Sequence, residues 1–516
     1  MIPFFKKHPR FGSLLLCLLS SVLLILSFPK FDYSPLVWFA LVPWFFAIDG
    51  KTRRGAFGLS FFTGFIFYAG TLYWFKYVTW AGAFLLTSYL SLFFGFFALG
   101  YLLFNRQSLG KRILFYACLW VSLEYFRSNF LSGFGWVTLS HTQYQNTALI
   151  QIADITGTYG ITFLVVAVNV LIKENLAYVF GMTDLKHPSL IKMNAGLLCI
   201  LLMVYGYGLF RLSHPVPMPY VKVGVIQGNI PQEEKWMQEN RTFTIQKYLT
   251  LSKAALNEHP DFLIWPETAF PGLIEEMPQL MEDIREFSRA ENIPLLIGVV
   301  AQESSKYYNS ALLITPDGKM NQRYDKFHLV PFGEFLPFRK QLPFLAHLIP
   351  IEDFSPGTKA RVFTWPIRQK DIRFSTAVCF EDTLAYITRR FVLNGAHLLI
   401  NITNDAWFGD TKEPFLHLQA AIFRTIETRR ALVRAANTGI SCFIDPYGRF
   451  MKFVQNAGGK KTYIDGTAVF WAPLNSSTTF YTKAGDIFTY LCFVCILCQG
   501  YAKRANNRTN RKKYAS

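Results

Sequence analysis

Long apolar runs occupy both ends of the chain, and a long polar stretch separates them. With their flanking residues these runs are long enough to cross a bilayer, which takes about 20 helical residues. We predict about eight spans. The candidates are Phe11–Phe28, Pro35–Ile48, Ala56–Phe75, Ala81–Phe104, Ile113–Phe126, Thr158–Ile172, Leu190–Phe210 and Ile487–Tyr501.

The polar stretch, roughly Ser213–Thr482, shows both strand and helix patterns. Short β-rich runs are predicted at Val221–Gln227, Phe262–Trp265, Pro294–Ala301, Ser310–Thr315, Ile372–Cys379, His397–Thr403 and Ile440–Ile444. Apolar residues recur at helical spacing in Thr242–Asn257, Met281–Ala290 and Leu416–Ala436, of which the last is the longest. Buried strands framed by helices predict a layered α/β domain with one substantial core.

These patterns divide the chain into three parts. We predict a transmembrane domain over residues 1–212, an α/β domain over residues 213–482, and a last span with a basic tail over residues 483–516. Basic loops alternate with loops that hold few Lys or Arg. The positive-inside rule then places both termini in the cytoplasm and the α/β domain on the outer face of the membrane.

Composition agrees with a membrane protein. Hydrophobic residues make up 51% of the chain and aromatic residues 17%, and the mean hydropathy is +0.22. The net charge is +18, and the tail Lys503–Lys513 is basic without any acid. A nucleic-acid partner is not favoured, because the tail directly follows an apolar segment, where basic residues fix membrane orientation.

The cysteines do not indicate a disulfide framework, because most of the 8 lie in apolar segments. The run Cys492-x-x-Cys495-x-x-Cys498 has the spacing of a metal motif, but its surroundings are those of a spanning helix without His or acidic ligands. Cys379 and Cys442 lie in the polar stretch, and whether Cys442 pairs is open. With no recognisable metal motif or phosphate loop, we expect no cofactor and no metal.

Three residues of the α/β domain suit covalent acyl transfer. Cys379 ends a predicted strand in VCFED, Glu267 follows another in LIWPET, and Lys326 lies in YDKFHLVPFGE. A thiol is the nucleophile, a carboxylate can take its proton, and an ammonium can stabilise the oxyanion. A lone Cys at a strand end is more often a packing residue. The catalytic interpretation depends on the three together, at strand ends where α/β domains usually place their chemistry.

Other segments near these residues have two interpretations each. Glu334 and Glu381 are acids that could orient Lys326 or polarise a carbonyl partner, whereas His328 is a candidate base that is better explained as structural. The segment Pro331–Pro350 is either a buried connector or, as we favour, a mobile lid at the membrane interface. The segment Leu131–Ile155 is either an interfacial loop or a wall of a site where lipid enters, and both remain open.

The motifs resemble the nitrilase superfamily of carbon–nitrogen hydrolases, which has Glu, Lys and Cys in this order. Three further motifs are similar to the membrane-embedded apolipoprotein N-acyltransferase family: GNIPQEEKW at Gly228–Trp236, VPFGEFLPF at Val330–Phe338 and NDAWFG at Asn404–Gly409. The resemblance covers essentially the whole chain. One position departs from it, because the family often has Tyr directly after the cysteine and this chain has Phe380.

The resemblance implies a four-layer α-β-β-α sandwich facing the periplasm from a bacterial inner membrane. It implies that the thiolate takes an acyl chain from a phospholipid, with phosphatidylethanolamine the expected donor. The α-amino group of the diacylglyceryl-cysteine of an apolipoprotein then attacks the thioester, which is the final step of lipoprotein maturation. We expect a monomer.

The resemblance also implies roles for individual residues. Cys379 would be the nucleophile, Glu267 the general base and Lys326 the transition-state stabiliser. The remaining residues implied are the supporting acids Glu334 and Glu381 and the lipid-site residues Trp236, Phe380 and Trp407.

Two other functions remain open from the sequence. A membrane-tethered amidase or nitrilase would use the same three residues, with water resolving the acyl-enzyme. Several spans argue against it, because a soluble substrate needs a single anchor. A non-catalytic transporter or lipid-binding protein is the other, and the scarcity of charged residues within the spans argues against transport.

Overall fold

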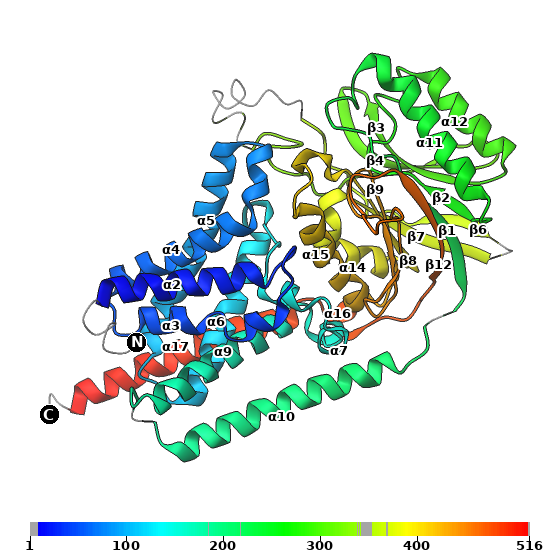
Figure 1. The fold of residues 1–516 in the computed structure, drawn as a ribbon. Coiled ribbons are helices and arrows are strands. Elements are labelled where there is room, and N and C mark those ends of the chain that lie inside the picture. Colours follow the sequence, from blue (N-terminus) through cyan, green and yellow to red (C-terminus); the bar gives the residue numbers. More distant parts are fainter. Residues whose placement is uncertain are drawn as a thin grey trace. The chain divides into compact units, whose positions relative to one another are not determined.

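The computed structural model describes residues 9–183, 185–216, 218–337, 339, 341, 353–367 and 370–513 (Figure 1). The chain forms two compact units. One comprises Met1–Ser213 together with Asp486–Ser516, and the other comprises His214–Gly485.

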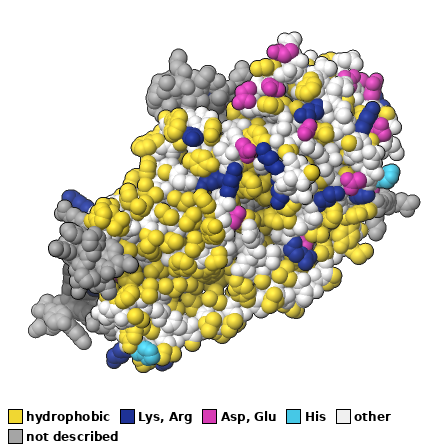
Figure 2. Space-filling model, viewed as in Figure 1, with side chains coloured by type: hydrophobic (Ala, Val, Ile, Leu, Met, Phe, Trp, Pro, Cys, Tyr) yellow, Lys and Arg dark blue, Asp and Glu magenta, His cyan; other side chains and the backbone are white. Residues whose placement is uncertain are grey.

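The first unit is helical. Its main helices are α2 (Pro9–Leu26), α3 (Val42–Ile48), α4 (Arg53–Thr71), α5 (Trp80–Phe104), α6 (Leu109–Asn129), α9 (Tyr159–Val179), α10 (His187–Leu212) and α17 (Ile487–Lys513). Short helices α7 (Thr147–Ile150) and α8 (Ala153–Thr156) lie between α6 and α9. Apolar side chains cover much of the visible surface of this unit (Figure 2). Four of them on α10, namely Leu198, Ile200, Leu202 and Met203, are each at least 43% exposed.

Among the described residues, 3 helices are long and apolar enough to cross a membrane by length and composition, namely α5, α9 and α10. The count of about eight spans is therefore not confirmed. The helix α6 shows why a predicted apolar run can be long enough to cross a membrane but not apolar enough. It is 21 residues long, but Lys111, Arg112, Glu124 and Arg127 interrupt its apolar sequence.

The predicted span Pro35–Ile48 does not form one continuous α-helix, so this span is not confirmed. The structure has a 3-10 helix at Ser34–Trp38, a turn, and then α3 (Val42–Ile48). Pro43 lies in the first turn of α3. Proline is accepted there because the first N–H groups of a helix have no intrahelical partner, whereas in a helix interior it would break the hydrogen-bond ladder.

The segment Leu131–Ile155 has a buried middle. Trp136 and the run 138–143 are each no more than 4% exposed. The backbone N–H of Leu139 donates to the buried Glu124 carboxylate at 3.0 Å. The middle of the segment is therefore packed into its own unit. Both interpretations, an interfacial loop and a wall of a lipid site, stay predictions.

The second unit contains two 6-stranded sheets. The first has the order β12-β1-β2-β3-β4-β5. Its strands are β1 (Tyr220–Gln227), β2 (Phe262–Ile264), β3 (Leu295–Glu303), β4 (Lys306–Ile314), β5 (Gln322–Asp325) and β12 (Gly466–Pro473). The neighbours β1, β2 and β3 run parallel, and the other pairs in this sheet are antiparallel.

The second sheet has the order β11-β10-β9-β8-β7-β6. Its strands are β6 (Phe363–Ile367), β7 (Lys370–Val378), β8 (Leu398–Thr403), β9 (Leu432–Ala436), β10 (Cys442–Ile444) and β11 (Phe450–Phe453). Its central strands β7, β8 and β9 also run parallel. Each sheet thus has a parallel centre, and the ends of these central strands feed the loops described below.

The sheets pack face to face between two layers of helices. Phe262 of β2 stacks on Phe374 of β7 with ring centroids 5.5 Å apart. The helices α11 (Arg241–Leu256) and α12 (Pro278–Ala290) cover the first sheet, and α14 (Ala385–Leu393) and α15 (Glu413–Thr428) cover the second (Figure 1). The predicted α-β-β-α sandwich is confirmed for the described part of this unit.

The predicted helix Leu416–Ala436 is wrong in its second half. The helix α15 ends at Thr428, and Arg429 adopts a left-handed conformation with φ 52°. The chain then enters β9, which pairs with β8 on one side and β10 on the other. The apolar residues of LVRAA continue the helical spacing of the preceding helix. Hydrogen bonds to a strand on each side nevertheless satisfy the backbone groups of this fully buried segment, so it is a strand.

Candidate active site

The candidate residues lie just after strands that come from both sheets. Glu267 is the third residue after β2, and Lys326 directly follows β5 in the first sheet. Cys379 directly follows β7 in the second sheet, where it begins a 3-10 helix at Cys379–Thr383. The sandwich therefore brings together side chains that are more than 100 residues apart in the sequence.

Glu267 is 6% exposed, and both its carboxylate oxygens are engaged. Asn309 of β4 donates its side-chain N–H to Oε1 at 2.7 Å. The backbone N–H of Asn404, directly after β8, donates to Oε2 at 2.9 Å. These two donors, one from each sheet, fix the orientation of the carboxylate.

Lys326 lies between two carboxylates. Its Nζ is 2.9 Å from the carboxylate of Glu334 and 3.7 Å from Oε1 of Glu267. The residue is 1% exposed. Burial lowers the pKa of Lys326, but the carboxylates of Glu334 and Glu267, together with Cys379 when it is ionised, outweigh burial and raise it above its usual value. Lys326 is therefore a fixed cation at the site.

The backbone of Cys379 is left-handed, with φ 53°. This conformation is uncommon for a residue with a side chain and is found at sites where the surrounding structure imposes it. Asn401 of β8 donates to the Cys379 carbonyl at 2.9 Å. The residue keeps partial exposure, so the nucleophile candidate is reachable.

The Cys379 thiol is held in its protonated form. Burial raises its pKa well above the usual range, and the Glu267 carboxylate raises it further. The Lys326 ammonium and a hydrogen bond with Thr403 act in the opposite direction. The thiolate must therefore form by transfer of the proton to a base during the reaction, and Glu267 is the carboxylate that acts most strongly on the thiol.

Glu381 is fully buried and joins the loops that carry Lys326 and Cys379. Its carboxylate accepts hydrogen bonds from the N–H groups of Phe327 at 2.7 Å and Val378 at 2.8 Å. The Tyr324 hydroxyl donates to it at 2.9 Å. Burial raises the pKa of Glu381 to about 7, although hydrogen bonds from Val378, His328 and Tyr324 and the charge of Lys326 lower it. Its position supports a structural role between the loops.

The aromatic candidates lie at the edge of this cluster. The Phe380 ring is 5.7 Å from that of His328, whose Nδ1 is 2.7 Å from the Tyr386 hydroxyl. Trp236 and Trp407 are surface side chains, 43% and 55% exposed. Trp407 lies in a short 3-10 helix, Asp405–Phe408, directly after Asn404. The Trp236 ring nevertheless borders the charged cluster, because its centroid is 5.9 Å from the Lys235 ammonium.

Sequence reasoning missed two residues of the cluster. Asn309 donates to Glu267 and, at 2.8 Å, to Glu334, so it bridges the two acids. Lys235 is 1% exposed and donates to the Glu267 carbonyl at 3.1 Å. Its place beside Trp236 in the quoted motif GNIPQEEKW is the only signal that the sequence offers for it.

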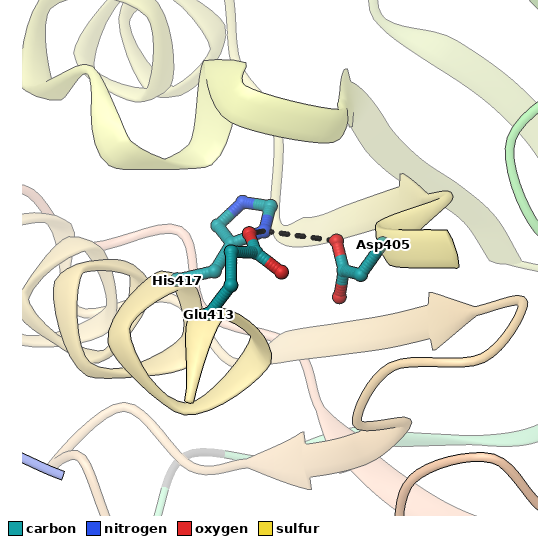
Figure 3. Close-up of side chains that lie close together, drawn as sticks. All are labelled: Asp405, Glu413 and His417. Carbon is teal, nitrogen blue, oxygen red and sulfur yellow. Dashed lines mark hydrogen bonds and ion pairs between the residues drawn. The ribbon is translucent and has the colours of Figure 1, made fainter. Parts of the chain in front are cut away.

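A second buried cluster lies behind the cysteine loop. Asp405, Glu413 and His417 have potential ligand atoms that all lie within 4.8 Å of one another. Figure 3 shows Glu413 and His417 projecting from α15 toward Asp405. His417 follows Glu413 at i, i+4, the helical spacing that could have indicated this pair from the sequence. Such a set of ligands suits a divalent cation.

Arg434 supplies a positive charge to this cluster. Its guanidinium lies 2.7 Å from Nδ1 of His417, the ring nitrogen that faces both carboxylates, and 3.4 Å from Asp405. It also pairs with Asp382, three residues after the candidate nucleophile. A metal at Nδ1 would have to sit beside the guanidinium, and the two positive charges would repel each other. The residues present therefore fit an ion-pair network better than a metal site.

The arrangement suits covalent acyl transfer. It joins a thiol to a carboxylate able to take its proton, and it adds a buried ammonium beside that carboxylate. An ammonium in a water-poor site stabilises an oxyanion more strongly than it would in water. This geometry serves an acyl-enzyme mechanism with any acceptor. It does not by itself select between an amine and water.

Comparison with known proteins identifies the family. The family model described as apolipoprotein N-acyltransferase N-terminal domain matches residues 20–171, and the model described as carbon-nitrogen hydrolase matches residues 222–465. An apolipoprotein N-acyltransferase of Chlorobaculum tepidum is 28% identical, over 92% of this chain and 93% of the relative. Its counterpart in Thermotoga maritima is 29% identical, over 96% and 95%.

A higher similarity is found to the apolipoprotein N-acyltransferase of Geobacter metallireducens. The two sequences are 38% identical over 509 residues, which is 95% of each chain. The match extends through both units, including the loops that carry Glu267, Lys326 and Cys379. With this identity over nearly its full length, the chain belongs to the apolipoprotein N-acyltransferase family.

Proposed function

We propose that this chain transfers an acyl chain from a phospholipid to the α-amino group of the N-terminal diacylglyceryl-cysteine of apolipoproteins. The family supports the reaction, and one structural observation carries its assignment to these residues. Glu267 and the Lys326 ammonium lie 3.7 Å apart, and both act electrostatically on the Cys379 thiol.

The first half-reaction forms a thioester. Glu267 takes the proton of the Cys379 thiol, and Sγ attacks the ester carbonyl carbon of the phospholipid. The Lys326 ammonium stabilises the resulting oxyanion. When the intermediate collapses, the ester C–O bond breaks, and the departing alkoxide takes the proton from Glu267. The products are the acyl-enzyme and a lysophospholipid.

The second half-reaction uses the same groups. The neutral amine of the acceptor attacks the thioester carbonyl, and Glu267 takes the proton that the amine loses. Lys326 again stabilises the oxyanion. The C–S bond breaks, and the leaving sulfur recovers a proton from Glu267. A thioester keeps the acyl group reactive toward an amine while the two substrates occupy the site in turn, so ping-pong kinetics follow.

The membrane setting completes the proposal. We propose about eight spans, both termini in the cytoplasm, and a catalytic domain facing the periplasm from the inner membrane. Phosphatidylethanolamine is the proposed donor and a monomer the proposed state. The exposed indoles of Trp236 and Trp407 are proposed to contact lipid, since Trp side chains favour the membrane interface.

The proposed lid, Pro331–Pro350, is described by the structure only at 331–337, 339 and 341. Its start is tied to the site, because the backbone N–H of Val330 donates to Glu334 at 2.8 Å. Phe332 is 48% exposed and has a left-handed backbone. Phe338 lies outside the described residues. Replacing Phe335 and Phe338 by Asp should weaken lipid turnover, and unchanged turnover would remove the lid from the proposal.

Intact-mass spectrometry of the full chain after incubation with phosphatidylethanolamine tests the first half-reaction. The wild type should gain one acyl mass that hydroxylamine removes, and Cys379→Ser should gain none. Cys442→Ala, which removes a buried thiol of the same domain, should behave as the wild type. Failure of the folded wild type to form an adduct would contradict the acyltransferase. Release of acyl groups to water at the rate of transfer would instead favour an amidase-like hydrolase.

A further inference from the structure

The buried lysine that sequence reasoning missed lies against the proposed general base. Lys235 is carried by the loop after β1, and its side chain reaches the turn that holds Glu267. Its ammonium donates to the Glu267 carbonyl at 3.1 Å and to the Thr268 hydroxyl at 2.6 Å. Burying an ammonium is costly unless its surroundings compensate it. Lys235 is 1% exposed, and both of its hydrogen-bond acceptors are neutral.

The turn that Lys235 contacts is itself unusual. Thr268, directly after Glu267, has a left-handed backbone with φ 46°, a costly conformation for a β-branched residue. The Lys235 ammonium binds the backbone carbonyl of Glu267, which precedes Thr268, and also the side-chain hydroxyl of Thr268. These contacts hold the turn in the conformation that directs the Glu267 carboxylate toward Asn309 and Asn404.

Lys235 adds a second positive charge to the residues around the nucleophile. Lys326 pairs with both Glu334 and Glu267, so these residues alone hold two carboxylates for one ammonium. Lys235 interacts electrostatically with Glu267 and with Cys379. Removing its charge would leave a forming thiolate beside an excess of negative charge. In a site of low dielectric, such an excess strongly disfavours the thiolate.

We propose that Lys235 is a second cation of the active site, a positioning residue that holds the Glu267 turn and whose charge favours ionisation of Cys379. The inference rests on the proposed role of Cys379 as nucleophile. The step it assists is transfer of the thiol proton from Sγ to the Glu267 carboxylate, which changes no other bond. Lys326 then serves the oxyanion, while Lys235 serves the thiolate that precedes it.

The protonation of Lys235 is compatible with this role. Burial lowers its pKa to about 8, while Glu267, and Cys379 once it is ionised, act to raise it. The ammonium therefore remains mostly charged at pH 7. Its pKa lies close enough to neutrality that the surrounding charges decide its state, as is common for groups at functional sites.

Three variants separate the charge of Lys235 from its hydrogen bonds. Lys235→Gln keeps donors for the Glu267 carbonyl and Thr268 without the charge, Lys235→Met removes both, and Lys235→Arg keeps the charge. Lys253→Met, on the exposed face of α11, is the matched control. The rate at which iodoacetamide alkylates Cys379 is measured against pH in the full chain, with the modified cysteine located by mass spectrometry. Acyl-enzyme formation is measured on the same samples.

The Gln and Met variants should alkylate Cys379 about tenfold more slowly at pH 7, with the profile moved to higher pH by about one unit. Acyl-enzyme formation should slow in parallel. The Arg variant should retain more reactivity than Gln, and Lys253→Met should match the wild type. A Gln variant with the wild-type profile, or Arg and Gln variants equally slow, would overturn the role of the charge.

Cys442 reports whether a variant remains folded, because this thiol is buried in the same domain. If it becomes alkylated in the Gln and Met variants, Thr268→Val is measured in their place. That change removes only the hydroxyl acceptor of the ammonium. Slower alkylation of Cys379 then supports the inference, and an unchanged rate contradicts it. An acyl adduct on the wild type keeps the proposed function intact in either case.

Discussion

The carboxylate of Glu267 accepts a hydrogen bond from the backbone N–H of Asn404 at 2.9 Å, and this bond joins the two sheets at the active site. Glu267 follows β2 of one sheet, and Asn404 follows β8 of the other. Because the donor is a backbone group, no substitution at position 404 short of proline removes it. The orientation of the proposed base thus depends on how the sheets pack.

Asn309 provides the other donor to Glu267, and its loss should slow acyl-enzyme formation. Asn309→Ala removes the bridge between Glu267 and Glu334. A hydrogen bond to a charged group contributes about 1.5–3 kcal/mol, which corresponds to a rate loss of roughly 10- to 100-fold. Time-resolved intact-mass spectrometry measures this rate. The exposed Asn321→Ala is the control, and equal rates for the two variants would contradict the bridge.

Glu334 should matter through its charge. Glu334→Gln keeps the size of the side chain but removes the carboxylate nearest the Lys326 ammonium. Lys326 would then be shared with Glu267 alone, and that stronger pairing should weaken the base. We expect kcat to fall about 100-fold with a smaller change in KM, because the loss falls on the transition state. Glu276→Gln, on the exposed surface, should have no effect, and a pure KM effect would refute this account.

The charge network behind the cysteine predicts a pH dependence of stability. Burial and Arg434 lower the pKa of His417, but Asp382 and Asp405 outweigh them and raise it to about 9. A histidine whose pKa is raised on folding contributes stability that is full below about pH 6.5. That contribution is lost as the pH rises through about 9. The thermal unfolding midpoint should therefore fall between pH 7 and pH 10, and His417→Asn should flatten this part of the profile. A variant as steep as the wild type would assign the loss to other groups.

The same network predicts that metal removal has no effect. Arg434 lies 2.7 Å from the His417 nitrogen that a metal would need. Dialysis against a strong chelator should leave acyl-enzyme formation unchanged. Elemental analysis of the purified chain should find far less than one divalent ion per molecule. A stoichiometric metal whose removal lowers the unfolding midpoint would show that the guanidinium moves aside for a cation.

The strand-end residues could be predicted because local sequence carries the signal. Cys379 and Glu267 each follow a short β-rich run, and parallel strands place such positions at the same edge of a sheet. Lys235 and Asn309 gave no comparable signal. Each contacts Glu267 across more than 30 residues of chain, and only the packed structure shows that contact.

Two elements differ from the prediction for a related reason. The apolar spacing of Leu416–Ala436 is helical throughout, yet the chain changes from α15 to β9 at Arg429. Apolar composition likewise suggested a single span at Pro35–Ile48, where Pro43 starts a new helix. In both cases periodicity identified a buried segment, but the backbone partners decided its structure.

Glu381 gives the site one further property. Its single carboxylate binds the N–H of Phe327, beside the lysine, and the N–H of Val378, beside the cysteine. The Glu381 carboxylate therefore holds the loop that carries the Lys326 ammonium and the loop that carries the Cys379 sulfur at a common point. The distance between ammonium and sulfur does not depend on each loop being positioned separately. Thermal movement in either loop carries the other with it, so the distance that matters for the chemistry fluctuates less than the loops themselves.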